Sequence, residues 1–275
     1  MSGHVIALGI ITVLSVPAFE RAGFAQESAH TCVVIREARS GTVWRSDPKL
    51  CATRLSPAST FKIPHALVAL ETGVVGPDTV EKWDGTRHPD LPKWDRDHSV
   101  TSAMRPSVLW FFQRIAPRVG AARMRQWLER VRYGNARTDG DVTRYWVNGT
   151  LQISPEEQVS FLQQFYADRL PIGREWQGLV RGALDQPPGT IENSRGVSRL
   201  EGTWPAGATW NAKTGRTGYA GRSVSWLVGE LSVDRDAYVF AAAVWRDGGP
   251  VGFLDGAHAA VTAFIERGLL KPSPR

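Results

Sequence analysis

Hydrophobic and polar positions repeat in three different ways along the chain. Near the amino end, apolar runs at 33–35 and 42–44 flank a Ser-Gly turn, which is typical of a β-hairpin. From about 78 to 166 the apolar residues recur mostly at helical spacing. After Pro187 they form short runs separated by glycines and charges, and this pattern predicts strands.

Individual elements can be placed within these parts. A predicted helix over 63–71 carries its apolar residues on one face and is stopped by Gly73; it starts near Ser59, because Pro64 is tolerated only in the first turn. Ser154 begins another helix, with a proline and two glutamates after it in a capping box. The remaining predicted elements are helices at 107–119, 121–132, 155–167 and 256–269, and strands at 209–212, 224–231 and 238–244.

The order of these elements predicts an α+β fold. We expect an antiparallel sheet flanked by helices, in which the amino- and carboxyl-terminal parts share one sheet, with an all-helical middle lobe. Residues 26–275 are expected to form a single domain, in which a helical lobe at about 78–186 is inserted into the lobe that contains the sheet. At this length the chain can bury a full core.

The first 25 residues differ from the rest of the chain. Apolar residues run almost without interruption over 5–16, a proline follows, and small residues stand at −3 and −1 before Gln26. This pattern predicts a secretory signal peptide at 1–25. The apolar run is too short to cross a bilayer, which takes about 20 residues. An uncleaved anchor and a buried strand are the alternatives, since residues 1–4 carry no lysine or arginine.

The two cysteines, Cys32 and Cys51, follow soon after the predicted cleavage site. The hairpin between them can bring them together, and an oxidising compartment favours a disulfide, with two buried thiols as the alternative. No metal site is expected, because the six histidines show no ligand spacing with each other or with the cysteines.

The net charge of +6 is basic, and removal of 1–25 leaves it unchanged because that segment holds one arginine and one glutamate. The densest basic stretch, 118–132, lies on an amphipathic helix pattern, which is typical of a solvated helix face. Nucleic-acid binding usually needs a denser cluster and a recognisable module. We therefore expect no nucleic-acid partner.

The candidate chemistry begins with Ser59 and Lys62, which stand three residues apart at a helix start, so that their side chains can touch. A serine hydroxyl becomes a nucleophile when a neighbouring base takes its proton. A lysine can be that base if burial lowers its pKa, and Phe61 and Ile63 provide apolar surroundings. The Ser-x-x-Lys pattern alone occurs by chance in many proteins.

Two further segments strengthen this hypothesis. Lys213, Thr214 and Gly215 end a predicted strand, where a cation, a hydroxyl and a residue without a side chain can line a substrate and meet its carboxylate. Ser107 opens a predicted helix and offers a second hydroxyl. Ser-x-x-Lys, a serine-containing element and Lys-Thr-Gly, in that order, are the signature of penicillin-recognising serine enzymes.

Within that group the chain resembles the class D, oxacillinase-type β-lactamases from about 32 to 270. The motifs that carry the resemblance are Pro-Ala-Ser-Thr-Phe-Lys-Ile-Pro at 57–64, Leu-Glu-Thr-Gly at 70–73, Tyr-Gly-Asn at 133–135, Trp146 with Leu-Gln-Ile-Ser at 151–154, and Lys-Thr-Gly at 213–215 ahead of Trp226 and Gly229. The class A enzymes match less well, because their Glu-x-x-x-Asn segment is not found before Ser154.

The resemblance implies a role for each catalytic residue. Ser59 would attack the lactam carbonyl, and Lys62 would react with carbon dioxide to give an N-carboxylated lysine, the general base of both steps. The indole N–H of Trp146 would hold that carbamate. Ser107, with Lys213 close by, would pass the proton to the leaving nitrogen. No other cofactor is implied.

The implied substrate-binding residues are Leu109, Thr214, Gly215 and Arg216. The backbone N–H groups of Ser59 and Arg216 would form the oxyanion hole. Two departures from the family stand out. Leu109 stands where the family usually has a valine and would press on the carbamate and on the path of the water. The arginine with which many class D members bind the substrate carboxylate is missing from 248–258. Arg246 and Arg216 are the alternatives for that role.

Structural alternatives accompany three of these assignments. The Tyr-Gly-Asn segment at 133–135 is interpreted as a turn more readily than as a chemical group. Trp146 is a core residue in most sequence contexts, and Ser107 can act as a helix cap alone.

The sequence thus predicts a periplasmic or secreted class D β-lactamase with one catalytic domain, a small-molecule β-lactam substrate and no membrane association after cleavage. The rival functions are a β-lactam sensor domain that stays acylated, and a cell-wall transpeptidase or carboxypeptidase. A membrane anchor, a signalling region or further domains would favour these rivals. The sequence predicts neither a preferred β-lactam nor an oligomeric state.

Overall fold

The computed structural model describes residues 28–274, so the predicted signal peptide at 1–25 lies outside the described residues. Its main sheet has six strands in the order β2-β1-β10-β9-β8-β5, all antiparallel to their neighbours. These strands are β1 (His30–Glu37), β2 (Val43–Arg45), β5 (Asp185–Gln186), β8 (Thr209–Tyr219), β9 (Arg222–Val233) and β10 (Asp236–Asp247). Two small hairpins are β3 (Val80–Glu81) with β4 (His98–Ser99), and β6 (Thr190–Asn193) with β7 (Gly196–Arg199).

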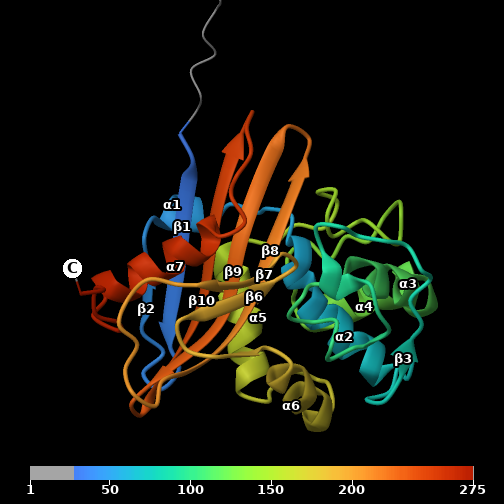
Figure 1. Cartoon of the computed structure of the whole chain (residues 1–275), viewed down its shortest axis with the longest axis horizontal. Helices are drawn as coiled ribbons and strands as arrows, with labels where there is room; N and C mark the ends of the chain where they lie inside the picture. The colour runs from blue at the N-terminus through green and yellow to red at the C-terminus, as the bar shows by residue number, and fades with distance from the viewer. Residues whose placement is uncertain (1–27, 275) are drawn as a thin grey trace, which may run out of the picture.

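Helices cover both faces of this sheet and form the second lobe beside it (Figure 1). Helix α7 packs on one face and α5 on the other. The helices are α1 (Pro48–Cys51), η1 (Ala58–Phe61), α2 (Lys62–Glu71), η2 (Pro92–Trp94), α3 (Leu109–Val119), α4 (Ala121–Arg130), α5 (Pro155–Tyr166), α6 (Arg174–Gly182) and α7 (Asp255–Glu266). Apart from β3 and β4, the lobe that follows α2 is helical, and the predicted α+β architecture is confirmed.

Successive side chains of β1 point to opposite faces of the main sheet and so contribute to two separate hydrophobic cores. Val33 and Ile35 pack in the core under α7, whereas Cys32 and Val34 face the opposite core, under α5 and next to the helical lobe. Because β1 pairs with β10 along its whole length, the amino- and carboxyl-terminal parts share one sheet, as the sequence predicts.

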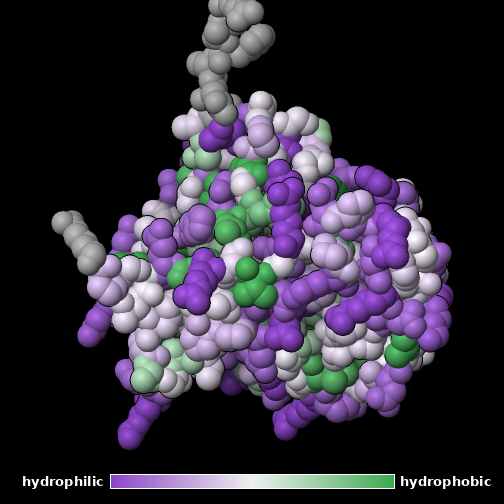
Figure 2. Space-filling model, in the orientation of Figure 1, coloured by the Kyte–Doolittle hydropathy of each residue, from purple (hydrophilic) through white to green (hydrophobic). Residues whose placement is uncertain are grey.

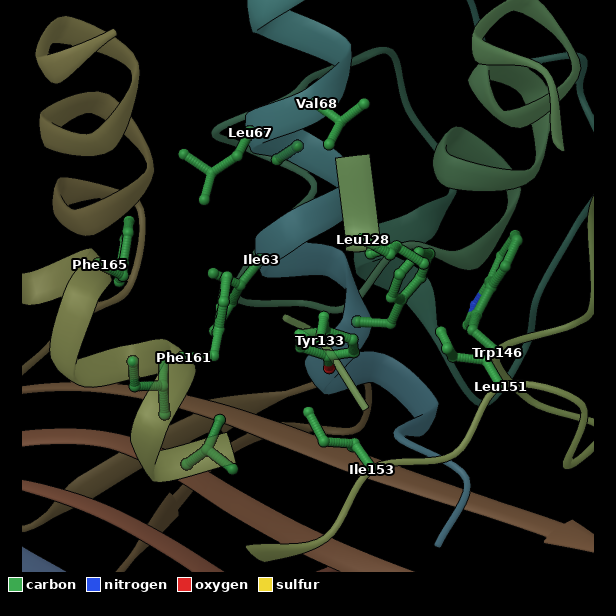
Figure 3. Packing of buried hydrophobic residues seen from close by; sticks show 14 of the residues in the cluster. Ile63, Leu67, Val68, Leu128, Tyr133, Trp146, Leu151, Ile153, Phe161 and Phe165 are labelled. Carbon is green, nitrogen blue, oxygen red and sulfur yellow. The ribbon is translucent and has the colours of Figure 1, made fainter. Parts of the chain in front are cut away.

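Helix α2 lies at the centre of the hydrophobic core on the α5 side of the sheet. Nine of its ten residues are buried, and Ile63, Leu67 and Val68 lie among side chains of α5 and of the 133–153 segment (Figure 3). Each fully buried aliphatic side chain contributes about 1.5–3 kcal/mol. Pro64 lies in the first helical turn and Gly73 follows the helix with φ +67°, so both predicted boundaries hold.

Two local predictions are confirmed by side-chain geometry. Ser154 Oγ accepts from the Glu157 N–H at 3.2 Å while the Glu157 carboxylate accepts from the Ser154 N–H at 2.9 Å, which completes the capping box of α5. Cys32 and Cys51 form a disulfide across 19 residues of sequence. The amino-terminal hairpin is therefore tied to the segment that leads to α2.

Other predictions are wrong in their boundaries. Strand β8 continues to Tyr219, so Lys-Thr-Gly lies in the middle of a strand and not at its end. Residues 216–219 show no hydrophobic pattern, yet each of them pairs with a residue of β9. Ser107 precedes α3 by two residues and has φ +60°, so it neither opens that helix nor caps it. Helix α6 and hairpin β6–β7 were not predicted.

The viewed face of the molecule is mostly hydrophilic over the helical lobe, and hydrophobic residues form small separate groups on it (Figure 2). Among residues 28–274, Val80 and Val197 are the large hydrophobic side chains that are exposed. No helix in this range combines the length and the apolar character needed to cross a membrane.

Candidate active site

Ser59 lies in the short helix η1, directly before α2, and is half-buried. The residue before it, Ala58, has φ +50°, a left-handed conformation that costs a non-glycine residue about 1–2 kcal/mol. Surrounding hydrogen bonds hold this turn: the Trp146 carbonyl accepts from Ser56 Oγ at 2.9 Å and from the Ala58 N–H at 3.0 Å. The same carbonyl thus fixes the serine turn to the Trp146 segment.

Strand β8 lies directly against this turn. A β-carbon at Gly215 would lie 3.0 Å from the Pro57 carbonyl oxygen and 3.2 Å from the Thr60 nitrogen, both of which belong to the rigid backbone. Any larger residue would push β8 away from this turn by a few tenths of an ångström, so glycine favours the close approach of β8. From the other side, Gln158 of α5 donates to Thr60 Oγ1 at 2.8 Å.

Lys62 donates from Nζ to Ser59 Oγ at 2.8 Å, as the three-residue spacing predicts. Its side chain is fully buried, and burial lowers the pKa of Lys62 from 10.5 to about 7. Within the described part of the chain it forms no ion pair with a carboxylate. A buried amine that is partly neutral near pH 7 is therefore held against a serine hydroxyl.

A second hydroxyl and amine pair stands beside the first. Lys213 donates from Nζ to Ser107 Oγ at 2.9 Å and to the Thr214 carbonyl at 2.8 Å. Burial lowers the pKa of Lys213 well below its ordinary value, and the charge of Lys62 acts in the same direction. Both site serines thus have a buried lysine as their neighbour.

Trp146 is fully buried (Figure 3), with its ring 5.6 Å from that of Phe61, the residue before Lys62, and its indole N–H has no hydrogen-bond partner among the described residues. An unpaired buried donor costs about 1–3 kcal/mol. His65, three residues after Lys62, is also fully buried, with its ring 5.5 Å from that of Trp146 and neither nitrogen paired. Burial, with the charge of Lys62, lowers the pKa of His65 to about 3, so the imidazole is neutral. Sequence reasoning missed His65, although its spacing from Lys62 is a helical one.

A cleft of about 400 Å³ opens in front of this buried layer. The predicted site residues that line it are Ser59, Ser107, Leu109, Thr214, Gly215 and Arg216, with Lys62, Trp146 and Lys213 behind. Of the two alternatives for carboxylate binding, Arg216 lines the cleft and Arg246 does not. Arg144, Arg195 and Phe253 also line it and were not predicted.

The Tyr-Gly-Asn segment serves as a turn. Asn135 donates from Nδ2 to the Thr150 carbonyl at 3.0 Å, and its Oδ1 accepts from the Gln152 N–H at 3.0 Å. These bonds hold the 146–153 segment, so the segment acts on the site through Trp146.

The described residues hold no group of three histidine, cysteine or acidic side chains placed to bind a metal. What the cleft does present is a serine hydroxyl hydrogen-bonded to a buried amine and, beside it, a second hydroxyl hydrogen-bonded to a second buried amine. Such an arrangement is typical of serine enzymes that work by acyl transfer.

Comparison with known proteins also indicates a serine enzyme of this kind. Residues 31–262 match the family model of the penicillin binding protein transpeptidase domain. Beta-lactamase OXA-5 of Pseudomonas aeruginosa is 33% identical over 224 residues, which are 79% of this chain and 77% of that protein. The solved class D β-lactamase BAT-2 is 28% identical with a TM-score of 0.72, over 88% of this chain and 92% of that one.

The C-terminal domain of the Bacillus licheniformis BlaR penicillin-receptor is also similar in structure. Its TM-score is 0.75 at 26% identity, over 88% of this chain and 92% of that domain. Within the penicillin-binding transpeptidase family, this chain belongs to the class D β-lactamases.

Proposed function

We propose that this protein hydrolyses β-lactams through an acyl-enzyme on Ser59, with Lys62 carboxylated by carbon dioxide and acting as general base. Membership in the class D family supports the reaction. The observation that carries the choice of base is a fully buried Lys62 that forms no ion pair within residues 28–274. Its neighbours Phe61 and His65 pack against Trp146, whose indole N–H is unpaired there.

The residues around Lys62 fit a carbamate. Only a neutral amine attacks carbon dioxide, and a pKa of about 7 makes about half of the Lys62 amine neutral at pH 7. Trp146 would donate its free N–H to a carbamate oxygen. The added negative charge would also lie near Lys213, whose ammonium has no carboxylate partner in residues 28–274. The carbamate supplies a base that accepts a proton at neutral pH.

In acylation the hydroxyl of Ser59 attacks the lactam carbonyl while Lys62 receives its proton. The backbone N–H groups of Ser59 and Arg216 stabilise the oxyanion, and such a donor contributes about 2.7–4 kcal/mol. Ser107 then passes this proton from Lys62 to the leaving nitrogen, giving up its own hydroxyl proton as it takes up the other. Lys213, hydrogen-bonded to Ser107 at 2.9 Å, keeps that hydroxyl oriented and favours the release of its proton.

In deacylation Lys62 activates the water that frees Ser59. The site lacks the Glu-x-x-x-Asn segment of class A enzymes, so the same residue serves both steps. Leu109 at the start of α3 lines the cleft and narrows the path of this water, which slows deacylation relative to a valine at that position.

A β-lactam sensor that stays acylated is the second candidate, because the structure resembles the BlaR penicillin-receptor domain and because Leu109 restricts the water. A cell-wall transpeptidase or carboxypeptidase is the third, since the matched family model is the transpeptidase domain.

We further propose export to the periplasm or the medium, with 1–25 as the signal peptide and 26–275 as a single catalytic domain whose helical lobe spans about 78–186. The disulfide between Cys32 and Cys51 supports an oxidising compartment.

Intact-protein mass spectrometry with a penicillin, with and without bicarbonate, tests the function. The wild type should form an adduct that disappears within minutes in bicarbonate. Lys62→Ala should keep any adduct it forms, and Ser59→Ala should form none. An adduct on Ser59→Ala would contradict the proposed nucleophile. A wild-type adduct that persists for hours in bicarbonate would instead identify a sensor.

A further inference from the structure

The cleft carries more positive charge than the catalytic residues require. We propose that Arg195, from the turn of hairpin β6–β7, joins Arg216 beside the Phe253 ring, and that the two guanidinium groups together bind the carboxylate of the β-lactam. The inference rests on the proposed function, because it concerns how the same cleft recognises its substrate.

Both arginines pack on one aromatic ring. The guanidinium carbon of Arg195 lies 4.3 Å from the centroid of Phe253, and that of Arg216 lies 4.7 Å from it. Arg216 is held further by donation from Nε to the Val251 carbonyl at 2.8 Å. A guanidinium stacked on a ring keeps its in-plane N–H donors free at the edge, and these match the two oxygens of a carboxylate.

The charges at this wall of the cleft are not balanced by the protein. Neither Arg195 nor Arg216 forms an ion pair within residues 28–274, and Arg144 lines the same cleft, also without an ion pair. The acidic residue among the lining side chains is the exposed Asp90. Two guanidinium groups on one ring repel each other, and a bound anion removes that repulsion. Penicillins and cephalosporins carry a carboxylate beside the lactam nitrogen.

The hairpin is fastened in place before any substrate binds. Glu192 of β6 lies 2.6 Å from Lys93 and 3.5 Å from Arg105, both of which belong to the helical lobe. The next residue, Asn193, is 3% exposed and accepts the Arg195 N–H at 2.8 Å through its side chain. Hairpin β6–β7, which crosses in front of the sheet in Figure 1, thus presents Arg195 from a fixed turn.

Arg195 and Arg216 could replace an arginine that this chain lacks after the Lys-Thr-Gly strand. The arginine that many class D enzymes carry after the Lys-Thr-Gly strand is missing from 248–258, and that stretch provides Phe253 instead. Arg195 comes before the Lys-Thr-Gly strand in the sequence, so in this chain the positive charge is supplied by a segment ahead of that strand and not by one after it.

Acylation kinetics with a penicillin and with its uncharged methyl ester test the inference. Arg195→Ala should lower the acylation efficiency of the free acid about 10- to 100-fold, mainly through weaker binding, and change that of the ester by less than about threefold. Arg195→Lys should recover part of the loss, because it keeps the charge but not the two-pronged donor geometry. Salt should weaken binding of the acid only.

Arg199→Ala is the matched control. Arg199 belongs to the other strand of the same hairpin, is exposed and does not line the cleft, so both substrates should react as with the wild type. An equal loss on acid and ester in Arg195→Ala, or no loss on either, would overturn the inference while the proposed function stands. A wild type that neither substrate acylates would remove the proposed function and this inference with it.

Discussion

Burial of Lys62 has a measurable effect on stability. The lowering of its pKa from 10.5 to about 7 corresponds to about 5 kcal/mol of unfolding free energy as an upper value, since water that enters the folded site reduces it. Lys62→Met removes the amine and keeps most of the volume. The variant should therefore be more stable than the wild type at pH 7, by about 2–5 kcal/mol.

The lowered pKa also determines how this stability difference changes with pH. Below about pH 7 the Lys62 amine is protonated in the folded and in the unfolded state, so burial of its charge destabilises the wild type by the full amount. Between about 7 and 10.5 the unfolded state binds more protons than the folded state, so wild-type stability rises with pH. The advantage of Lys62→Met should shrink through this range and vanish near pH 10.5. The charge of Lys62 also lowers the pKa of Lys213 in the wild type and is absent from Lys62→Met, which adds to the advantage of the variant at pH values where Lys62 is protonated.

Urea unfolding at pH 7, 8, 9 and 10 measures this difference. The buffers must be free of carbon dioxide, because carboxylation of the folded state would stabilise the wild type by mass action. Adding bicarbonate should then raise wild-type stability and leave Lys62→Met unchanged. Lys49→Met, at an exposed lysine, is the control and should show no trend. A difference between Lys62→Met and the wild type that is constant with pH, or that grows with it, would refute the reasoning.

Three further predictions concern other parts of the structure. Trp146→Phe keeps an aromatic ring, though a smaller one, and removes the unpaired N–H, so the bicarbonate needed for half-maximal turnover should rise about 10-fold or more; an unchanged bicarbonate dependence argues against a bond to the carbamate. Leu109→Val should speed the decay of the penicillin adduct by widening the path of the water, and slower decay would show that Leu109 does not obstruct it. Replacing both Cys32 and Cys51 by alanine should lower the unfolding free energy by about 3 kcal/mol or more in urea, and equal stability would show that the disulfide contributes little.

The sequence predicts the parts of the site that depend on short spacing. Ser59 and Lys62 are three residues apart on one helical turn, and the structure places Nζ 2.8 Å from Oγ. The capping box of Ser154 and the position of Pro64 follow from equally local rules. Long-range order is predicted only coarsely, as one sheet shared by the two ends of the chain.

The remainder depends on contacts between distant segments. Strand β8 extends past Gly215 because β9 pairs with it, which no hydrophobic period along 215–219 reveals. Ser107 reaches Lys213 from a left-handed turn, 106 residues away in sequence. Arg195 enters the cleft on a hairpin whose strands are only four residues each, too short for a clear pattern.

We propose that a carboxylated Lys62 turns over the acyl-enzyme on Ser59. The most direct measurement is ¹³C NMR of the protein in ¹³C-bicarbonate, with the penicillin hydrolysis rate taken on the same samples as bicarbonate is increased. A protein-bound carbamate signal should appear in the wild type and be absent from Lys62→Met, and the hydrolysis rate should rise in proportion to its intensity. Full hydrolysis in samples without that signal would contradict the account.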